Sequence, residues 1–193
     1  MIFWQLGFPI LYYLLITTIL HLNSRSARQS NHFSARLPID DRVPFRPGLS
    51  PVYFSAYGLG VAGYLAVVEN PILPRIVIGY FAIFMVCALV YWFLPSRIER
   101  ANPAAVPLLR ARWLVAYQRT ADPYNNFPSM HTAFCTYSAL VVFLFFRPTW
   151  LGWLMFFWLG LVMISTLLTK QHYLLDLVAG ALVSAAVFWI LLA

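Results

Sequence analysis

Long apolar runs separated by polar stretches dominate this chain of 193 residues. A helix needs about 20 mostly apolar residues to cross the hydrocarbon core of a bilayer. Backbone polar groups inside lipid must be satisfied within the segment, which favours helices over irregular structure. We therefore expect an all-α, polytopic membrane protein with one membrane-embedded domain over residues 1–193. The pattern predicts six transmembrane helices: Met1–Leu22, Leu49–Val68, Pro74–Leu94, Ser129–Phe146, Pro148–Leu168 and Tyr173–Ala193.

Composition favours the same class of protein. Hydrophobic residues make up 62% of the chain and charged residues only 10%, whereas a soluble domain is about half apolar and a quarter charged. The first apolar run has no basic segment before it and is too long for a signal peptide, so we expect a retained span rather than a leader. The net charge of +7 is not read as nucleic-acid binding, because basic loops in membrane proteins set topology and contact anionic lipids.

The polar connections predict which ends of the helices lie together. Six spans place Asn23–Gly48, Pro95–Phe127 and Thr169–His172 on one side of the membrane, and that side carries eleven of the thirteen Lys and Arg residues. The excess of positive charge predicts that these connections face the cytoplasm. Some of the charges are candidates for binding phosphate on either side, which leaves the orientation open.

The first candidate for chemistry is the pair His172 and Asp176. Residues four apart on a helix share one face. The carboxylate would accept a hydrogen bond from one ring nitrogen and leave the other nitrogen free to attack. The alternative is a polar pair at a helix end whose members only satisfy each other.

The second candidate is His131, which follows Ser129 at the start of a predicted span. Ser129 is a good N-cap, and the first turn of a helix binds anions through its backbone N–H groups. A histidine there can donate a proton to a departing oxygen. The alternative is an interfacial histidine that faces lipid headgroups.

Basic residues near these histidines are candidate phosphate ligands. Arg97 and Arg100 follow the third predicted span, and Lys170 lies two residues before His172. Guanidinium groups would clamp phosphoryl oxygens and stabilise the charge that develops on them. The alternative is that the basic residues anchor the topology, which is the interpretation we prefer for Arg110, Arg112 and Arg119. If both histidines act on one phosphate, their ring nitrogens should lie on the order of 5–8 Å apart.

The motifs around the histidines resemble those of the type 2 phosphatidic acid phosphatase superfamily. Its second motif, Pro-Ser-Gly-His, is similar to Pro128–His131, and its third motif, Ser-Arg followed by His and Asp, is similar to Ser165-Thr166 with His172 and Asp176. Glycine is replaced by Met130, and the arginine of the third motif is replaced by Thr166. The first motif is degenerate, because Arg100 is followed by alanine rather than proline.

These departures resemble one branch, the inositol phosphorylceramide synthases and their bacterial relatives. That branch has a similar approach to its second motif, here Asp122–Phe127, and often has Ser-Thr in its third motif. Asp40–Phe45 also looks similar to bacterial members, so a bacterial cell membrane is expected. Asn126 and Asp41 are further candidates for substrate binding. For Asp40 and Asp41 we prefer the alternative that they pair with arginines of the same loop, namely Arg36, Arg42 or Arg46.

The resemblance implies a phosphohistidine mechanism on a lipid substrate that bears a phosphate. His172 would attack phosphorus, Asp176 would orient it, and His131 would protonate the leaving oxygen and then activate the acceptor. Arg100, Lys170 and the Ser129 region would hold the phosphoryl oxygens, with no metal and no cofactor. Transfer to another alcohol and hydrolysis by water stay open, with a lean towards headgroup transfer. A protein that binds or transports lipids without catalysis is the further alternative, which the loss of arginine at Thr166 favours.

Overall fold

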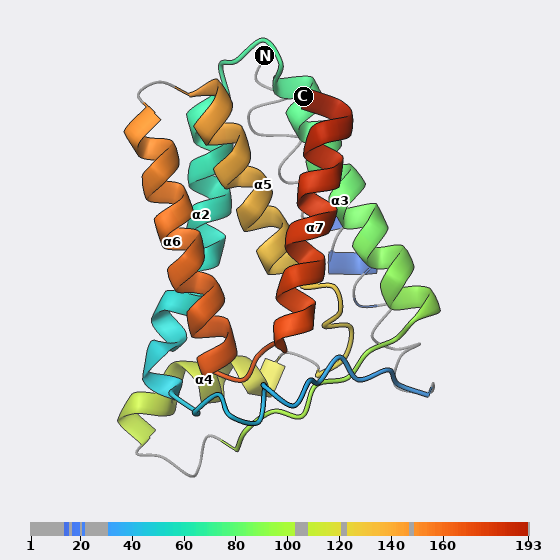
Figure 1. Ribbon diagram of the computed structural model, residues 1–193, viewed down its shortest axis with the longest axis vertical. Helices are drawn as coiled ribbons and strands as arrows, with labels where there is room; N and C mark the ends of the chain where they lie inside the picture. Colours follow the sequence, from blue (N-terminus) through green and yellow to red (C-terminus); the bar gives the residue numbers. More distant parts are fainter. Residues whose placement is uncertain are drawn as a thin grey trace.

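The structure is a computed structural model that describes residues 31–102, 108–120, 123–146 and 149–192, together with residues 14, 15, 17–19 and 21. Within these residues the fold is helical, and the helices are arranged as a bundle (Figure 1). The elements are η2 (Pro47–Leu49), α2 (Ser50–Val67), α3 (Leu73–Phe93), α4 (Leu108–Thr120), α5 (Met130–Phe145), α6 (Thr149–Leu168) and α7 (Leu174–Leu192).

Five of the six predicted spans coincide with described helices. Three of them, α3, α6 and α7, are long and apolar enough to cross a membrane, and α5 is a shorter apolar helix of 16 residues. The helix α2 has 18 residues at the position of the second predicted span. Most of Met1–Leu22 lies outside the described residues. The described part of the chain therefore has three candidate spans, and the number six stays a prediction.

The connection predicted over Pro95–Phe127 contains a helix that the sequence analysis did not anticipate. The helix α4 has 13 residues and lies across the lower end of the bundle in Figure 1. It packs on η2 and α2, and its Leu114 is fully buried. A search for runs of about 20 apolar residues misses such an element, because α4 is short and interrupted by arginines.

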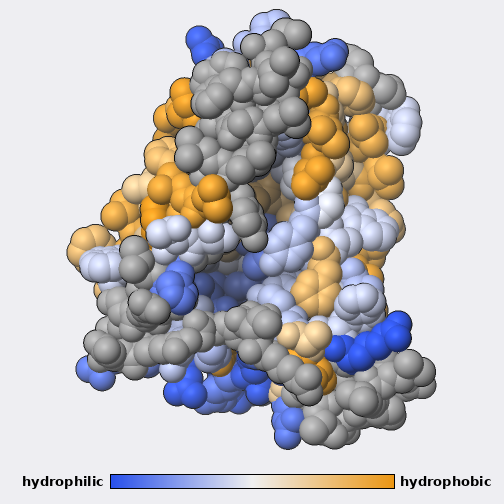
Figure 2. Space-filling model, turned by 180° about the vertical axis from the view of Figure 1, so that it is seen from behind, coloured by the Kyte–Doolittle hydropathy of each residue, from blue (hydrophilic) through white to orange (hydrophobic). Residues whose placement is uncertain are grey.

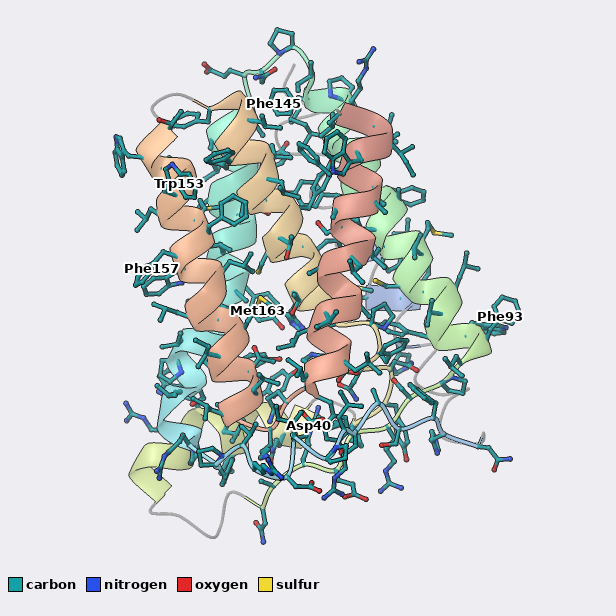
Figure 3. All side chains as sticks on the ribbon, viewed as in Figure 1. Asp40, Phe93, Phe145, Trp153, Phe157 and Met163 are labelled. Carbon is teal, nitrogen blue, oxygen red and sulfur yellow. The ribbon has the colours of Figure 1, made fainter. Side chains whose placement is uncertain are left out.

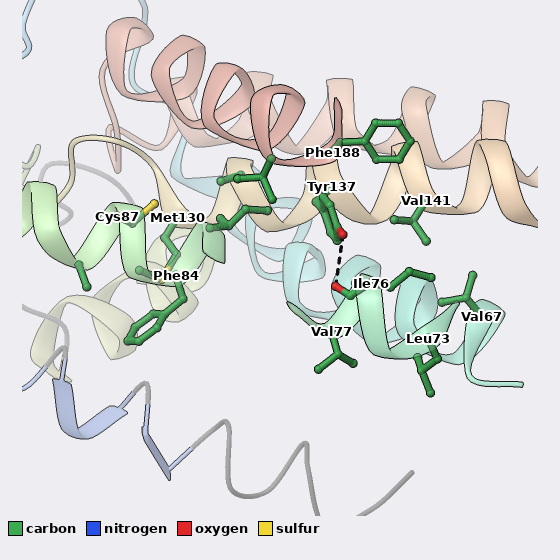
Figure 4. Packing of buried hydrophobic residues seen from close by; sticks show 14 of the residues in the cluster. Val67, Leu73, Ile76, Val77, Phe84, Cys87, Met130, Tyr137, Val141 and Phe188 are labelled. Carbon is green, nitrogen blue, oxygen red and sulfur yellow. Dashed lines mark hydrogen bonds between the residues drawn. The ribbon is translucent and has the colours of Figure 1, made fainter. Parts of the chain in front are cut away.

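The helix α5 is the centre of the bundle and packs on α2, α6 and α7, while α3 packs chiefly on α7. One buried cluster joins α3, α5 and α7 through Ile76, Phe84, Tyr137, Val141 and Phe188 (Figure 4). The Tyr137 hydroxyl donates a 3.2 Å hydrogen bond to the carbonyl oxygen of Ile76. The one polar atom of this aromatic side chain is thereby satisfied inside an apolar core.

The outer surface of the bundle carries large apolar side chains. Trp153 and Phe157 project outward from α6 (Figure 3), and both are about two-thirds exposed. On the face seen in Figure 2, hydrophobic side chains lie along both flanks of the upper half, and hydrophilic side chains gather around a hollow below them. An apolar belt with a polar end is the pattern expected of helices surrounded by lipid.

The polar connections meet at one end of the bundle, as the predicted topology requires. Phe33 pairs with Ser96 in a parallel bridge, and Arg97 pairs with Tyr124 in an antiparallel bridge. Helices α2, α5 and α7 begin at this end, and α3 and α6 finish there (Figure 1). Segments from four parts of the chain are therefore brought to one face.

A glycine allows α7 to approach the start of α5 closely. A methyl group on Gly180 would collide with the carbonyl oxygen of Ser129 and would lie 3.3 Å from the backbone nitrogen of Ala133. The backbone N–H of Ser129 also donates a 2.9 Å hydrogen bond to the carbonyl oxygen of Asp176. The first turns of the two helices are therefore in direct backbone contact.

We expect Gly180→Ala to lower the free energy of unfolding by about 1–3 kcal/mol, the usual range for overpacking, because the obstructing atom is backbone and cannot rotate away. Gly160→Ala is the matched control, since a methyl group there meets no described atom within 4 Å. The control should be neutral or more stable by up to about 1 kcal/mol, because alanine is the better helix former. Unfolding in mixed detergent micelles measures both; equal stability of the two variants would contradict the close approach.

Candidate active site

The turn between α6 and α7 positions His172. The N–H groups of Lys170 and Gln171 donate to the carbonyl oxygens of Leu167 and Thr166, and Lys170 has a left-handed φ of 54°. This is the hydrogen-bond pattern of a Schellman motif, which ends a helix and reverses the chain. His172 therefore precedes α7 instead of lying on it. The sequence analysis placed His172 and Asp176 on one face of the same helix. That placement is wrong, because only Asp176 lies on α7.

The contact between His172 and Asp176 is nevertheless present. His172 Nδ1 lies 3.1 Å from the carbonyl oxygen of Asn126 and 3.4 Å from Asp176 Oδ2. Both partners are acceptors, so Nδ1 carries the hydrogen and the lone pair of the neutral ring is on Nε2. The exposed fractions of the side chains are 6% for His172 and 1% for Asp176, which fixes the ring in this orientation.

Asp176 is held by the start of its own helix. It is the third residue of α7, and its Oδ2 accepts a 2.8 Å hydrogen bond from the backbone N–H of Tyr173, the residue before the helix. This is the backward half of a capping box. The positive end of the α7 dipole also favours a carboxylate at this position. Its other oxygen, Oδ1, is buried and has no hydrogen-bond partner among the described residues.

His131 faces His172 from the first turn of α5. Ser129 is the N-cap, as predicted, and its hydroxyl oxygen accepts a hydrogen bond from the backbone N–H of Thr132. The centroids of the His131 and His172 rings are 6.1 Å apart. At this separation the two rings make an edge-on contact. The distance predicted from the sequence concerned the ring nitrogens, and it stays a prediction.

Sequence reasoning missed two tyrosines that contact His131 and a third tyrosine that contacts one of them. The Tyr57 hydroxyl lies 2.9 Å from His131 Nε2, and the Tyr53 ring lies 5.7 Å from the His131 ring. The hydroxyl of Tyr53 donates a 3.2 Å hydrogen bond to the hydroxyl of Tyr117 on α4. Tyr53 and Tyr57 are four apart on α2, so they share a face. The spacing could have shown that Tyr53 and Tyr57 lie on one helix face, but nothing in the sequence related that face to His131.

Ser96 anchors the loop that carries Asn126. Its hydroxyl oxygen accepts hydrogen bonds from the backbone N–H groups of Asn126 (2.8 Å) and Phe127 (2.9 Å), and its carbonyl oxygen accepts one from Asn125. The Asn126 side chain donates to the carbonyl oxygen of Pro123. Asn126, predicted to bind substrate, contributes its main-chain oxygen to His172 instead, and a direct substrate contact stays a prediction.

Asp40 connects the loop before α2 to both sides of His172. Its Oδ1 accepts from the backbone N–H of Leu174 (3.0 Å), and its Oδ2 accepts from Leu37 (2.7 Å). Lys170 Nζ donates a 2.6 Å hydrogen bond to the Asp40 carbonyl oxygen. The carboxylate is 4% exposed and lies in the loop region at the lower end in Figure 3. Asp40 therefore accepts hydrogen bonds from buried backbone groups. The interpretation that we preferred from the sequence, an ion pair between Asp40 and an arginine, is wrong.

Asp41 differs from its neighbour. It is exposed and forms an ion pair with Arg36, whose guanidinium also bonds to Glu99. The hydrogen bond to Asp41, followed by its negative charge, raises the pKa of the Arg36 guanidinium above its ordinary value. This pairing is the alternative that the sequence analysis preferred for Asp41.

The predicted cationic ligands are not equally placed. The guanidinium carbon of Arg100 lies 5.6 Å from the centre of the Tyr117 ring, on the side of the site that holds His131. Arg97 is exposed and lies over the Tyr124 ring at 5.9 Å. Lys170 is directed to Asp40, and the hydroxyl of Thr166 donates to the carbonyl oxygen of Val162. Arg100 is therefore the predicted cation that the described contacts bring towards the histidines.

The helices α5 and α7 both begin at the lower end of the bundle in Figure 1, where His131 and His172 lie in the sequence. Helix N-termini carry partial positive charge and favour anions. Among the described residues, no group of three or more His, Cys, Asp or Glu side chains is arranged to hold a metal ion.

An apolar helical bundle with a buried, carboxylate-held histidine opposite a second histidine is suited to phosphoryl transfer on a membrane-bound substrate. The chain belongs to the PAP2 superfamily, whose family model matches residues 76–193, more than half of the sequence. The match includes α5, α6 and α7 and therefore both histidines and Asp176. Members of this superfamily are phosphatases and phosphotransferases acting on lipid-like substrates. Neither a curated protein nor a solved structure was found to match the chain.

We expect the Asp40 contacts to govern the position of His172. Asp40→Asn removes one acceptor and Asp40→Ala removes two, and each buried N–H left without a partner costs about 1–3 kcal/mol. Consumption of a phosphorylated lipid should therefore fall in the order wild type, Asn, Ala, by about tenfold or more for Ala. Glu69→Gln, an exposed carboxylate between α2 and α3, is the control and should retain wild-type turnover. An Ala variant as active as the control would exclude this role.

Proposed function

We propose that this protein is a lipid phosphotransferase or phosphatase that works through a phosphohistidine intermediate on a phospholipid or sphingolipid-type substrate. The observation that carries the proposal is the position of His172 Nδ1 against two acceptors, the Asn126 carbonyl oxygen and the Asp176 carboxylate. That arrangement leaves the Nε2 lone pair as the nucleophile. The second histidine, 6.1 Å away between ring centroids, supplies the acid.

The reaction proceeds in two displacements. In the first, His172 Nε2 forms a bond to phosphorus while the bond from phosphorus to the leaving oxygen breaks, and His131 gives its proton to that oxygen. The new imidazolium-like charge on His172 is stabilised by Asp176 through Nδ1–H. In the second, His131 takes the proton of an incoming hydroxyl group, whose oxygen binds phosphorus as the N–P bond breaks. These steps use protein groups only.

The phosphoryl oxygens carry the developing negative charge. Arg100 and the first turns of α5 and α7, including Ser129, are proposed to stabilise it. Arg97, Lys170, Asn126 and Asp41 remain candidates from the sequence whose described contacts serve other partners.

We propose transfer of a phospho-headgroup to a lipid alcohol as the preferred outcome, with hydrolysis of a lipid phosphate, such as phosphatidic acid or an isoprenyl phosphate, as the alternative. The similarity of Asp122–His131 and Ser165-Thr166 to the inositol phosphorylceramide synthase branch supports transfer. We place the protein in a bacterial cell membrane as a multi-pass protein. The excess of basic residues in the connections supports a site that faces the cytoplasm.

A lipid-binding or transport protein without catalysis is the second candidate, and one observation favours it. The position at which the family carries arginine is Thr166, whose hydroxyl is bonded to its own helix, and Lys170 is bonded to Asp40. Lys170, the candidate to replace the missing guanidinium, is thus committed to a backbone oxygen. Under this hypothesis the lipid binds but its phosphate ester is not cleaved.

His172→Ala separates the two candidates. We expect it to abolish nearly all turnover of phosphatidic acid, because no other described nitrogen has the same orienting partners. His32→Ala, a histidine stacked on Tyr124 at 4.9 Å, should keep at least about half of the activity. Turnover in purified protein, measured as release of labelled diacylglycerol, checks both variants. Wild-type protein that binds the lipid but shows no turnover would favour the second candidate.

The acceptor decides between transfer and hydrolysis. Purified protein is incubated with labelled phosphatidylinositol or phosphatidic acid, with and without ceramide or diacylglycerol. We expect labelled headgroup on the added alcohol and slow release of free phosphate without it. Release of phosphate at the same rate with and without acceptor would contradict transfer and leave hydrolysis.

A further inference from the structure

A groove lies between the start of α2 and the helix α4. Its volume is about 520 Å³, and it is lined by Pro51, Phe54, Trp113, Ala116 and Tyr117. Ligand pockets in proteins usually measure roughly 300–1,000 Å³. Ala116 and Trp113 are exposed, so the groove opens to the surroundings of the protein.

The walls of the groove are apolar and aromatic. The rings of Phe54 and Tyr117 make an edge-on contact with centroids 5.3 Å apart. The Tyr117 hydroxyl is hydrogen-bonded to the hydroxyl of Tyr53, so the ring of Tyr117 is the part that can face the groove. Trp113 carries its own polar atom on a largely exposed ring, as is common for tryptophan at a membrane interface.

The groove lies next to the histidine pair, with one side chain between them. Tyr117 lies against Tyr53, with ring centroids 5.7 Å apart, and Tyr53 lies against His131 at the same distance. Tyr53 is 1% exposed and therefore forms a fixed partition between the two. One side chain separates the groove from the space where a phosphate would be.

Cationic groups flank the groove. The guanidinium carbons of Arg100 and Arg112 lie 5.6 Å from the Tyr117 ring and 5.5 Å from the Trp113 ring. The helix α4 lies across the end of the bundle (Figure 1), the orientation of an amphipathic helix at a membrane interface. An apolar channel beside basic groups and an anion site is complementary to an amphiphile with an anionic head.

We propose that this groove binds one hydrocarbon chain of the lipid whose phosphate is placed between His131 and His172. The inference rests on the proposed function and adds the site that selects a lipid over a chain-free phosphate. A chain gains little free energy by moving from the bilayer into an apolar groove. The groove therefore acts by orienting the substrate. A chain fixed beside Tyr117 aligns the phosphorus with His172 Nε2, and this alignment increases the rate of the chemical step.

Filling the groove tests this role. In full-length protein in micelles, Ala116→Trp should lower kcat/KM for dioleoyl phosphatidic acid about tenfold and change kcat/KM for p-nitrophenyl phosphate, which has no chain, by less than about twofold. Ile164→Trp is the matched control, because it fills a different groove of about 390 Å³ that shares no lining residue with the first. The control should leave both values unchanged.

Three results would overturn the inference: unchanged turnover of both substrates in Ala116→Trp, equal loss on both, or the same selective loss in Ile164→Trp.

If Ala116→Trp does not fold, or if the wild-type protein turns over neither substrate, photolabelling decides. Phosphatidic acid with a diazirine at the middle of one chain should label the wild-type peptides that contain Phe54 or Trp113. Labelling only of peptides outside the groove would overturn the inference. That result is expected if the groove holds an acceptor lipid or a helix of a partner protein instead of the substrate chain. Labelling without turnover would sink the proposed function and keep the groove.

Discussion

The backbone contact between the first turns of α5 and α7 is the constraint on which the site depends. Ser129 donates its N–H to the carbonyl oxygen of Asp176, and Gly180 lets the two backbones touch. One helix carries His131 and the other carries Asp176, with His172 in the turn before it. A small displacement of α7 would therefore change the distance between the rings and the contact of Nδ1 with Asn126 together. In lipid, such close packing is a principal source of helix association.

Around this contact, the polar groups of the connections are used to fix geometry rather than to bind solvent. Ser96 holds the loop that presents the Asn126 carbonyl oxygen, and Asp40 holds the turn on both sides of His172. A buried carboxylate is costly unless it is hydrogen-bonded, and Asp40 and Asp176 both accept backbone N–H groups. The helices α5 and α7 also begin at this end of the bundle, where the first turn of a helix carries partial positive charge.

The sequence was sufficient for the parts of the structure that follow from local pattern. Hydrophobic runs predicted the positions of α3, α6 and α7, and the topology that follows from them predicted that His131, His172 and Asp176 meet at one end. The Ser129 cap is equally local. The roles of Tyr53, Tyr57 and Ser96 depend on packing between segments that lie 30 or more residues apart, which no local pattern encodes. Asp40 was assigned to an arginine because a carboxylate in a basic loop most often has that partner, whereas burial gave it backbone donors instead.

His172 is proposed to attack phosphorus through Nε2, because Nδ1 is held by Asn126 and Asp176. The most direct measurement is the position of the phosphoryl group in the trapped intermediate. Purified protein is mixed briefly with phosphatidic acid labelled in its phosphate and quenched in base, which preserves phosphohistidine, and the labelled peptide is analysed by NMR and mass spectrometry. We expect phosphate on Nε2 of His172. Phosphate on Nδ1, on another residue, or on no residue during active turnover would contradict it.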